Sequence, residues 1–138
     1  MRELIRRLLN LRKSGTKTLA QTLGSRGEEL VARHVRRDLH MKVVARNQRF
    51  VGGELDIVAI DGHDLAFIEV RTRRSDNAGA PELTVGTEKR RFLRRSARKF
   101  MSQRRLTSFT PRFDIAAVVW PTDGQPEIRY HKNAFPPR

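Results

Sequence analysis

Apolar residues recur at helical spacing in two stretches of the chain. The first runs from about Glu28 to Leu39, and Ser25 stands three residues before Glu28, which is the spacing of a capping box. The second runs from about Thr87 to Arg104. Residues three or four positions apart share one face of a helix, so each stretch predicts an amphipathic helix. The expected buried stripes are Leu30, Val31, His34 and Val35 in the first helix, and Phe92, Leu93, Ala97, Phe100 and Met101 in the second.

Three shorter stretches between these helices have the length and residue types of β-strands. They cover residues 41–46, 54–60 and 65–72. The segments between them, 47–53 and 61–64, contain glycine and read as turns. The pattern therefore predicts three strands in an antiparallel meander.

The most continuous apolar stretch lies in the last third of the chain, from Arg112 to Trp120. A strongly apolar stretch of this length is typical of a central strand that is buried on both faces. Residues 127–131 predict a short edge strand, and residues 73–86 predict a long loop. The order of helix, three strands, helix and one or two strands indicates an α/β fold.

The chain is strongly basic, with a formal net charge of +14 and an isoelectric point near 11.6. Such a charge points to a polyanionic partner, either nucleic acid or an anionic membrane surface. The absence of cysteine excludes disulfides and cysteine-ligated zinc, and it fits a cytoplasmic location. No apolar run approaches the roughly 20 residues of a membrane-spanning helix.

The length of 138 residues predicts a single domain, which we place at residues 23–138. Residues 1–22 form a basic N-terminal extension. Arg6 and Arg7 interrupt its apolar positions, so it is not a secretory signal. The extension is either a weakly docked tail or an amphipathic helix for a membrane surface or a partner.

Acidic residues cluster in two of the predicted strands. Side chains alternate along a strand, so Glu54 and Asp56 share one face of the first, and Glu69 and Arg71 share one face of the second. A hairpin of these strands would bring Asp56 close to Glu69. Adjacent carboxylates repel, so they need a cation between them or one of them must be protonated. Mg²⁺ is a cation that suits carboxylates, water and phosphate. The alternative is a solvent-facing hairpin whose acids pair with basic neighbours.

Several short motifs stand in a specific order and spacing along the chain. They are Gly27-Glu28, Ala45-Arg46-Asn47, Gly53-Glu54-Leu55-Asp56-Ile57, Phe67 to Arg73, Lys89, Ala97 and Arg112-Phe113-Asp114. In these motifs, over roughly residues 23–135, the chain resembles the YraN family of uncharacterised bacterial proteins. That family looks like a branch of the restriction-endonuclease-like superfamily and is similar to archaeal Holliday-junction resolvases. The resemblance implies an αβββαβ core, a mixed central sheet flanked by helices and a PD-(D/E)xK site.

The resemblance also implies roles for individual residues. Asp56 matches the first metal-binding aspartate, and Glu69 matches the second acid. Val70 would contribute its backbone carbonyl to the metal, and Glu28 matches an extra acid on the first helix. Glu54 matches the acid of the GE(I/L)D version of the motif, as a ligand or as a structural neighbour. The implied cofactor is Mg²⁺ or Mn²⁺.

Arg71 departs from the motif, which has lysine at that position. A lysine can lose its proton and help to activate water, whereas an arginine stays charged and can only orient and stabilise a phosphate. Lys89 at the start of the second helix could instead swing towards the site, or it could simply face solvent.

Basic side chains form a stripe on the second helix, opposite its apolar face. The run contains no acid, so a phosphate backbone would relieve its self-repulsion, although a charged helix face can also be merely solvated. No element carries base-reading side chains, so binding would follow shape and charge. The predicted nucleic-acid contacts are Arg73, Arg74, Arg91, Arg94, Arg95 and Arg98.

These patterns support three hypotheses. The first is a metal-dependent, structure-selective DNA endonuclease, for which a junction-resolving role would imply a homodimer. The second is a non-catalytic DNA- or RNA-binding protein on a degenerate nuclease scaffold. The third is a membrane-surface adaptor that uses the N-terminal helix.

Overall fold

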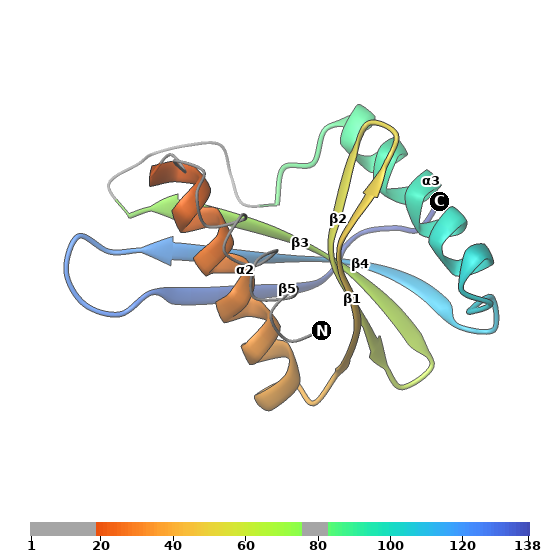
Figure 1. Cartoon of the computed structure of the whole chain (residues 1–138), viewed down its shortest axis with the longest axis horizontal. Helices are drawn as coiled ribbons and strands as arrows, with labels where there is room; N and C mark the ends of the chain where they lie inside the picture. Colours follow the sequence, from red (N-terminus) through yellow and green to blue (C-terminus); the bar gives the residue numbers. More distant parts are fainter. Residues whose placement is uncertain (1–18, 76–82) are drawn as a thin grey trace, which may run out of the picture.

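A computed structural model describes residues 19–75 and 83–138 of the chain. Two helices and five strands make up this part (Figure 1). In chain order they are α2 (Leu19–Arg37), β1 (Lys42–Phe50), β2 (Gly53–Asp61), β3 (Asp64–Arg74), α3 (Thr87–Gln103), β4 (Thr110–Trp120) and β5 (Glu127–Phe135).

The strands form one mixed sheet in the order β1-β2-β3-β4-β5. The first three strands pair antiparallel, β3 and β4 pair parallel, and β5 returns antiparallel to β4. The single parallel pair needs a crossover, which α3 provides. The element order is therefore αβββαβ followed by an edge strand, and the expected α/β fold with a mixed sheet is confirmed.

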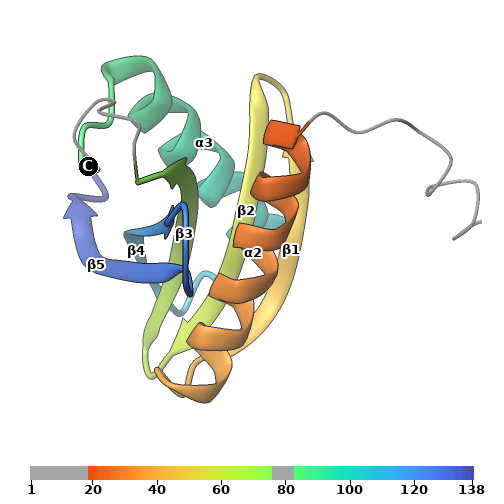
Figure 2. The ribbon, with the colours of Figure 1, turned by 90° about the vertical axis from the view of Figure 1, so that its left-hand side faces the viewer.

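Each face of the sheet carries its own apolar core, and the two helices cover different faces (Figure 2). On the α3 side, Phe92 and Phe100 pack against Phe67 and Phe113. On the α2 side, buried residues of the helix such as Val31 pack against the small and β-branched side chains of β2, β3 and β4. This division follows from the alternation of side chains along the strands.

The structure confirms the expected buried stripe of α3, the central position of β4 and the edge position of β5. Two other expectations are wrong. The first helix begins at Leu19, so Ser25 and Glu28 lie inside it and form no capping box. The turn expected at residues 47–53 is much shorter, because β1 continues through Phe50 and β2 starts at Gly53.

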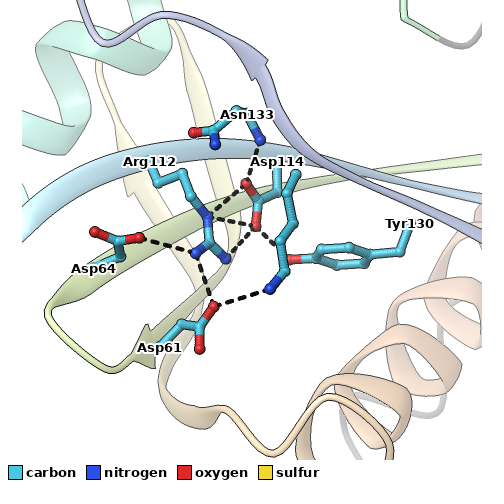
Figure 3. Close-up of polar contacts among 7 residues, drawn as sticks. Asp61, Asp64, Arg112, Asp114, Tyr130 and Asn133 are labelled. Atoms are coloured by element: carbon cyan, nitrogen blue, oxygen red, sulfur yellow. Dashed lines mark hydrogen bonds and ion pairs between the residues drawn. The ribbon is translucent and has the colours of Figure 1, made fainter.

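A buried polar network fastens the β2–β3 turn to β4 and β5 (Figure 3). Arg112 Nη2 lies 2.8 Å from Asp114 Oδ2, and its Nη1 lies 2.8 Å from Asp61 Oδ2 and 3.1 Å from Asp64 Oδ2. The Tyr130 hydroxyl donates to Asp114 at 2.6 Å. The side chain of Asp114 has no exposed surface, so these partners and the backbone N–H of Asn133, 3.1 Å from its Oδ1, must stabilise its charge.

Among the helices of the described residues, none is both long and apolar enough to cross a bilayer.

Replacement of Arg112 by methionine should lower the free energy of unfolding by about 3–5 kcal/mol, because it leaves a buried carboxylate without its cation. Arg129→Met is the matched control, since the pair of Arg129 with Glu127 is exposed and should contribute about 1 kcal/mol at most. Urea unfolding of the two variants measures the difference, and equal losses would show that the network does not stabilise the fold.

Candidate active site

The candidate site lies where β2 parts from β3. The β2–β3 ladder runs from the pair Asp61–Asp64 to the pair Ile57–Ile68 and ends there. Asp56 and Glu69 are the next residues along the two strands. Beyond them β3 stays paired with β4, whereas β2 stays paired with β1 and the β1–β2 hairpin turns away (Figure 1).

Asp56 fills the gap that opens between the parting strands. Its Oδ2 accepts a hydrogen bond of 2.9 Å from the backbone N–H of Val70. In a strand, the N–H and C=O of one residue point to the same edge. The Val70 carbonyl therefore also faces the gap, on the side of Asp56.

The strict alternation expected along β2 breaks at this point. Leu55 packs in the core on the α3 side together with Val58, while Ile57 packs on the α2 side. The expected alternation of side chains is therefore wrong between Leu55 and Val58. The irregularity extends into β1, where Asn47 has a φ of 51° and lies between residues that pair with Ile57 and Leu55.

Burial and mutual repulsion shift the acids towards their protonated forms. The pKa of Asp56 rises to about 7, mainly because the side chain is buried and then because of the charges of Glu69 and Glu28. The Val70 N–H and the Lys89 ammonium oppose this rise. Burial also raises the pKa of Glu69 and of Glu28, and Glu54 adds to the rise at Glu28. A divalent cation would relieve this unfavourable concentration of negative charge.

Two cations come close to Glu69. Lys89 Nζ, from the first turn of α3, lies 3.4 Å from Glu69 Oε2. The charge of Arg71, two residues along β3, also lowers the pKa of Glu69. Even so, Glu69 Oε2 is buried and lacks a hydrogen bond of good geometry among the described residues. Lys89 thus lies beside the acids as the ion-pair partner of Glu69.

Asn47 links the two outer acids of the site. With its amide nitrogen turned towards them, it donates to Glu54 Oε1 and to Glu28 Oε2, both at 2.9 Å. Sequence reasoning assigned Asn47 no role. An asparagine inside a strand was the available signal, because asparagine tolerates the left-handed backbone conformation that it adopts here.

The donor atoms fit a hard divalent ion, although the protein supplies only part of a coordination shell. Carboxylate and carbonyl oxygens are the preferred ligands of Mg²⁺. Within residues 19–75 and 83–138, no three acids or histidines converge closely enough to hold a metal by themselves. Mg²⁺ commonly binds through one or two carboxylates, with water and substrate phosphate as its other ligands. Asp56, Glu69 and the Val70 carbonyl match that arrangement.

Glycine at position 27 sets the distance between α2 and the site. A Cβ atom at this position would lie 2.3 Å from Thr72 Oγ1 of β3. Helix and strand can approach this closely only because the side chain is absent. The contact places the next residue, Glu28, beside the acids of the sheet.

The predicted basic contacts fall into two groups. Arg94 donates to the Pro136 carbonyl at 3.1 and 2.7 Å, and Arg95 donates to the Val51 carbonyl at 3.1 Å. These two side chains therefore also tie α3 to neighbouring segments. Arg74, Arg91 and Arg98 are exposed, and Arg73 is half-buried near the end of β3.

Comparison with known proteins identifies relatives along most of the chain. Residues 27–118 match the uncharacterised protein family UPF0102, which is the YraN family that the sequence motifs resemble. A UPF0102 protein of Geotalea daltonii is 36% identical over 115 residues, which are 83% of this chain and 90% of the relative. A UPF0102 protein of Geobacter sulfurreducens is 39% identical over 82% of this chain and 88% of the relative. A UPF0102 protein of Syntrophotalea carbinolica is 41% identical over 83% of this chain and 91% of the relative.

The metal-free protein should become less stable as the pH rises from about 5 to 7. Folded Asp56, with its pKa near 7, keeps a proton that the unfolded chain releases near the ordinary aspartate pKa of 3.8. The folded state then binds more protons, so the free energy of unfolding falls by up to about 1.4 kcal/mol per pH unit. Glu69 and Glu28 act in the same direction.

Urea unfolding in EDTA at pH 5, 6 and 7 tests this dependence. Asp56→Asn should reduce the fall of the free energy of unfolding with rising pH. Asp123→Asn, at an exposed position, should leave this fall unchanged. Identical slopes for the wild type and Asp56→Asn would refute the raised pKa of Asp56.

Gly27→Ala and Gly24→Ala should change stability in different ways, although both sites lie inside α2. Each variant gains helix propensity of about 1 kcal/mol. Only Gly27→Ala meets Thr72, since a Cβ at Gly24 has nothing within 4 Å. Overpacking should therefore make Gly27→Ala about 1–3 kcal/mol less stable than Gly24→Ala. This difference in stability between the two variants should shrink in a Thr72→Ala background. If it persisted there, contact with Thr72 would not be its cause.

Proposed function

We infer that this chain, which belongs to the UPF0102 family, binds nucleic acid and hydrolyses its phosphodiester bonds with a divalent metal ion. The substrate class that we favour is DNA of defined structure, such as a junction or a flap. The chain would recognise it by shape and backbone rather than by base sequence.

One observation carries this proposal. Asp56 and Glu69 occupy the gap between the parting strands β2 and β3, with a backbone N–H of Val70 on Asp56 and the ammonium of Lys89 near Glu69. These acids have raised pKa values inside a chain with a net charge of +14. A solvent-facing pair of acids would keep its ordinary pKa values, so this cluster is better suited to binding a cation.

The residues that would hold the metal are Asp56, Glu69, the Val70 carbonyl and Glu28. A bound Mg²⁺ or Mn²⁺ supplies a water of lowered pKa and neutralises charge on the phosphate. Asp56 must release its proton for this role, and its hydrogen bond from Val70 favours the charged form. Asn47 holds Glu28 and Glu54 in place.

Arg71 and Lys89 would divide the work that the motif usually assigns to one lysine. Arg71 stays charged and can hold a phosphate with two N–H groups. Lys89 reaches Glu69 from α3 and is half-exposed, so it can contact an attacking water or a phosphate oxygen. The exposed Arg74, Arg91 and Arg98 would contact the backbone outside the cleavage site.

A non-catalytic nucleic-acid-binding protein is the second candidate, and the arginine at position 71 favours it. In that case the basic surface would bind DNA or RNA, and the acids would be the remnant of an active site. The membrane-surface role depends on residues 1–18, which lie outside the described residues, and it stays a prediction. A homodimer also stays a prediction.

Cleavage of labelled four-way junctions, flaps, duplexes and single strands tests the proposal. Each substrate is incubated with the full chain in Mg²⁺, Mn²⁺ or EDTA. We expect metal-dependent cutting that Asp56→Asn lowers by more than about 100-fold, since even outer partners of a metal site contribute 10- to 100-fold. Asp123→Asn is the matched control, because it makes the same change on an exposed turn between β4 and β5.

The outcomes separate the two candidates. Cutting that Asp56→Asn abolishes and Asp123→Asn preserves establishes an enzyme. Salt-sensitive binding without cutting in either metal establishes the binding protein instead. In both cases a double replacement of Arg91 and Arg98 by alanine should make binding less salt-dependent. The slope of the logarithm of the binding constant against the logarithm of the salt concentration should fall by about one per lost phosphate contact.

A further inference from the structure

A second concave site lies on the α2 side of the sheet, outside the acid cluster. It is a pocket of about 250 Å³ lined by Arg26, Glu29, Leu30, Trp120, Gln125 and Pro126. We infer that this pocket binds one unpaired nucleobase, stacked with the indole of Trp120. The inference rests on the proposed function, because it names the form in which the strand would reach the site.

The pocket lies at the same end of the fold as the acids. Trp120 is the last residue of β4, where it pairs with Arg74 and accepts a hydrogen bond of 2.8 Å from the N–H of Ser75. Arg74 lies five residues beyond Glu69 on β3, a distance of roughly 16 Å along the strand. Arg26 precedes Glu28 by two residues on α2. The pocket and the acid cluster therefore both use the middle of α2, and Trp120 of the pocket pairs with the strand that carries Glu69.

The side chains of the pocket suit a flat aromatic ligand. The guanidinium carbon of Arg26 lies over the Trp120 ring, 4.8 Å from its centroid. Tryptophan and arginine both stack on nucleobases, and such stacking is tolerant of base sequence. Arg26 is exposed, so it can move aside and stack on the outer face of an inserted base. Leu30 and Pro126 supply apolar walls.

Polar groups at the pocket match the edge of a base. Glu29 already binds Arg46 at 2.9 Å through one oxygen, and Gln125 carries an amide with both donor and acceptor atoms.

The charge around the pocket favours a nucleotide over an apolar peptide. Arg26 lines the pocket and Arg74 adjoins Trp120 on the neighbouring strand. A base that enters the pocket brings its own phosphate, which these cations would attract. A double helix keeps its bases stacked and unavailable, so the pocket would select unpaired nucleotides at a junction, a flap or a single strand.

Trp120 is the only tryptophan of the chain, so its fluorescence reports on the pocket directly. The full-length protein is titrated in EDTA with a single-stranded oligonucleotide and with an abasic oligonucleotide of the same length and charge. Fluorescence anisotropy of a label on each oligonucleotide measures binding independently. A third titration uses a free mononucleotide.

We expect loss of tryptophan fluorescence with the base-containing strand and none with the abasic strand at equal occupancy. Quenching by the mononucleotide as well would mean that the pocket accepts free nucleotides, whereas quenching by the strand alone would mean that it reads a nucleic acid. Arg26→Ala should raise the apparent dissociation constant of the fluorescence titration about two- to fivefold. Arg37→Ala removes an exposed arginine farther along α2 and should not change it.

Equal quenching by both oligonucleotides, or anisotropy-detected binding with unchanged tryptophan emission, would overturn the inference. The cleavage assay is independent of this readout. Base-dependent quenching without any cutting refutes the nuclease and keeps the pocket, whereas cutting without quenching keeps the nuclease and refutes the pocket.

Discussion

The hydrogen bond from the Val70 N–H to Asp56 is the interaction on which the candidate site depends. Where β2 leaves β3, this N–H loses its place in the antiparallel ladder. An unpaired buried N–H would cost about 1–3 kcal/mol, and the carboxylate of Asp56 satisfies it instead. The same bond stabilises the charged form of an acid whose burial favours protonation. One contact thus ends the pairing and holds the central acid in the opening.

Two groups of carboxylates in this protein have opposite electrostatic surroundings. Asp114 is fully buried, and Arg112, Tyr130 and the N–H of Asn133 all donate to it (Figure 3). Glu69 is also largely buried, but its Oε2 has only an ion-pair contact with Lys89. A carboxylate whose oxygens all accept hydrogen bonds stabilises the fold, whereas one whose oxygen still lacks a hydrogen bond is suited to binding a ligand. This contrast distinguishes the structural frame of the fold, which includes the network around Asp114, from the candidate site.

The frame holds the site from two sides. The network around Arg112 fixes the turn end of β2 and β3, and the contact of Gly27 with Thr72 fixes α2 against β3. Between these points, α3 places Lys89 beside Glu69, and the buried apolar residues of α3 pack on the phenylalanines of the sheet. Elements from both faces of the sheet therefore meet at the parting of β2 and β3, where the acids and their neighbouring cations lie.

The sequence by itself determined the features that depend on local backbone geometry. Helical and strand periods predicted the buried stripe of α3, the central β4 and the adjacency of Asp56 and Glu69, since a hairpin fixes which residues face each other. The same periods predicted the αβββαβ order, and the resemblance to a known family implied the same core.

The tertiary structure decided the features that depend on contacts between distant segments. It placed Lys89 beside Glu69, set Asn47 between Glu28 and Glu54, and broke the alternation of β2 at Asp56. It also began α2 at Leu19, well before the expected cap. No local period encodes these contacts, because they arise when helices from opposite faces of a sheet pack against strands that have already diverged.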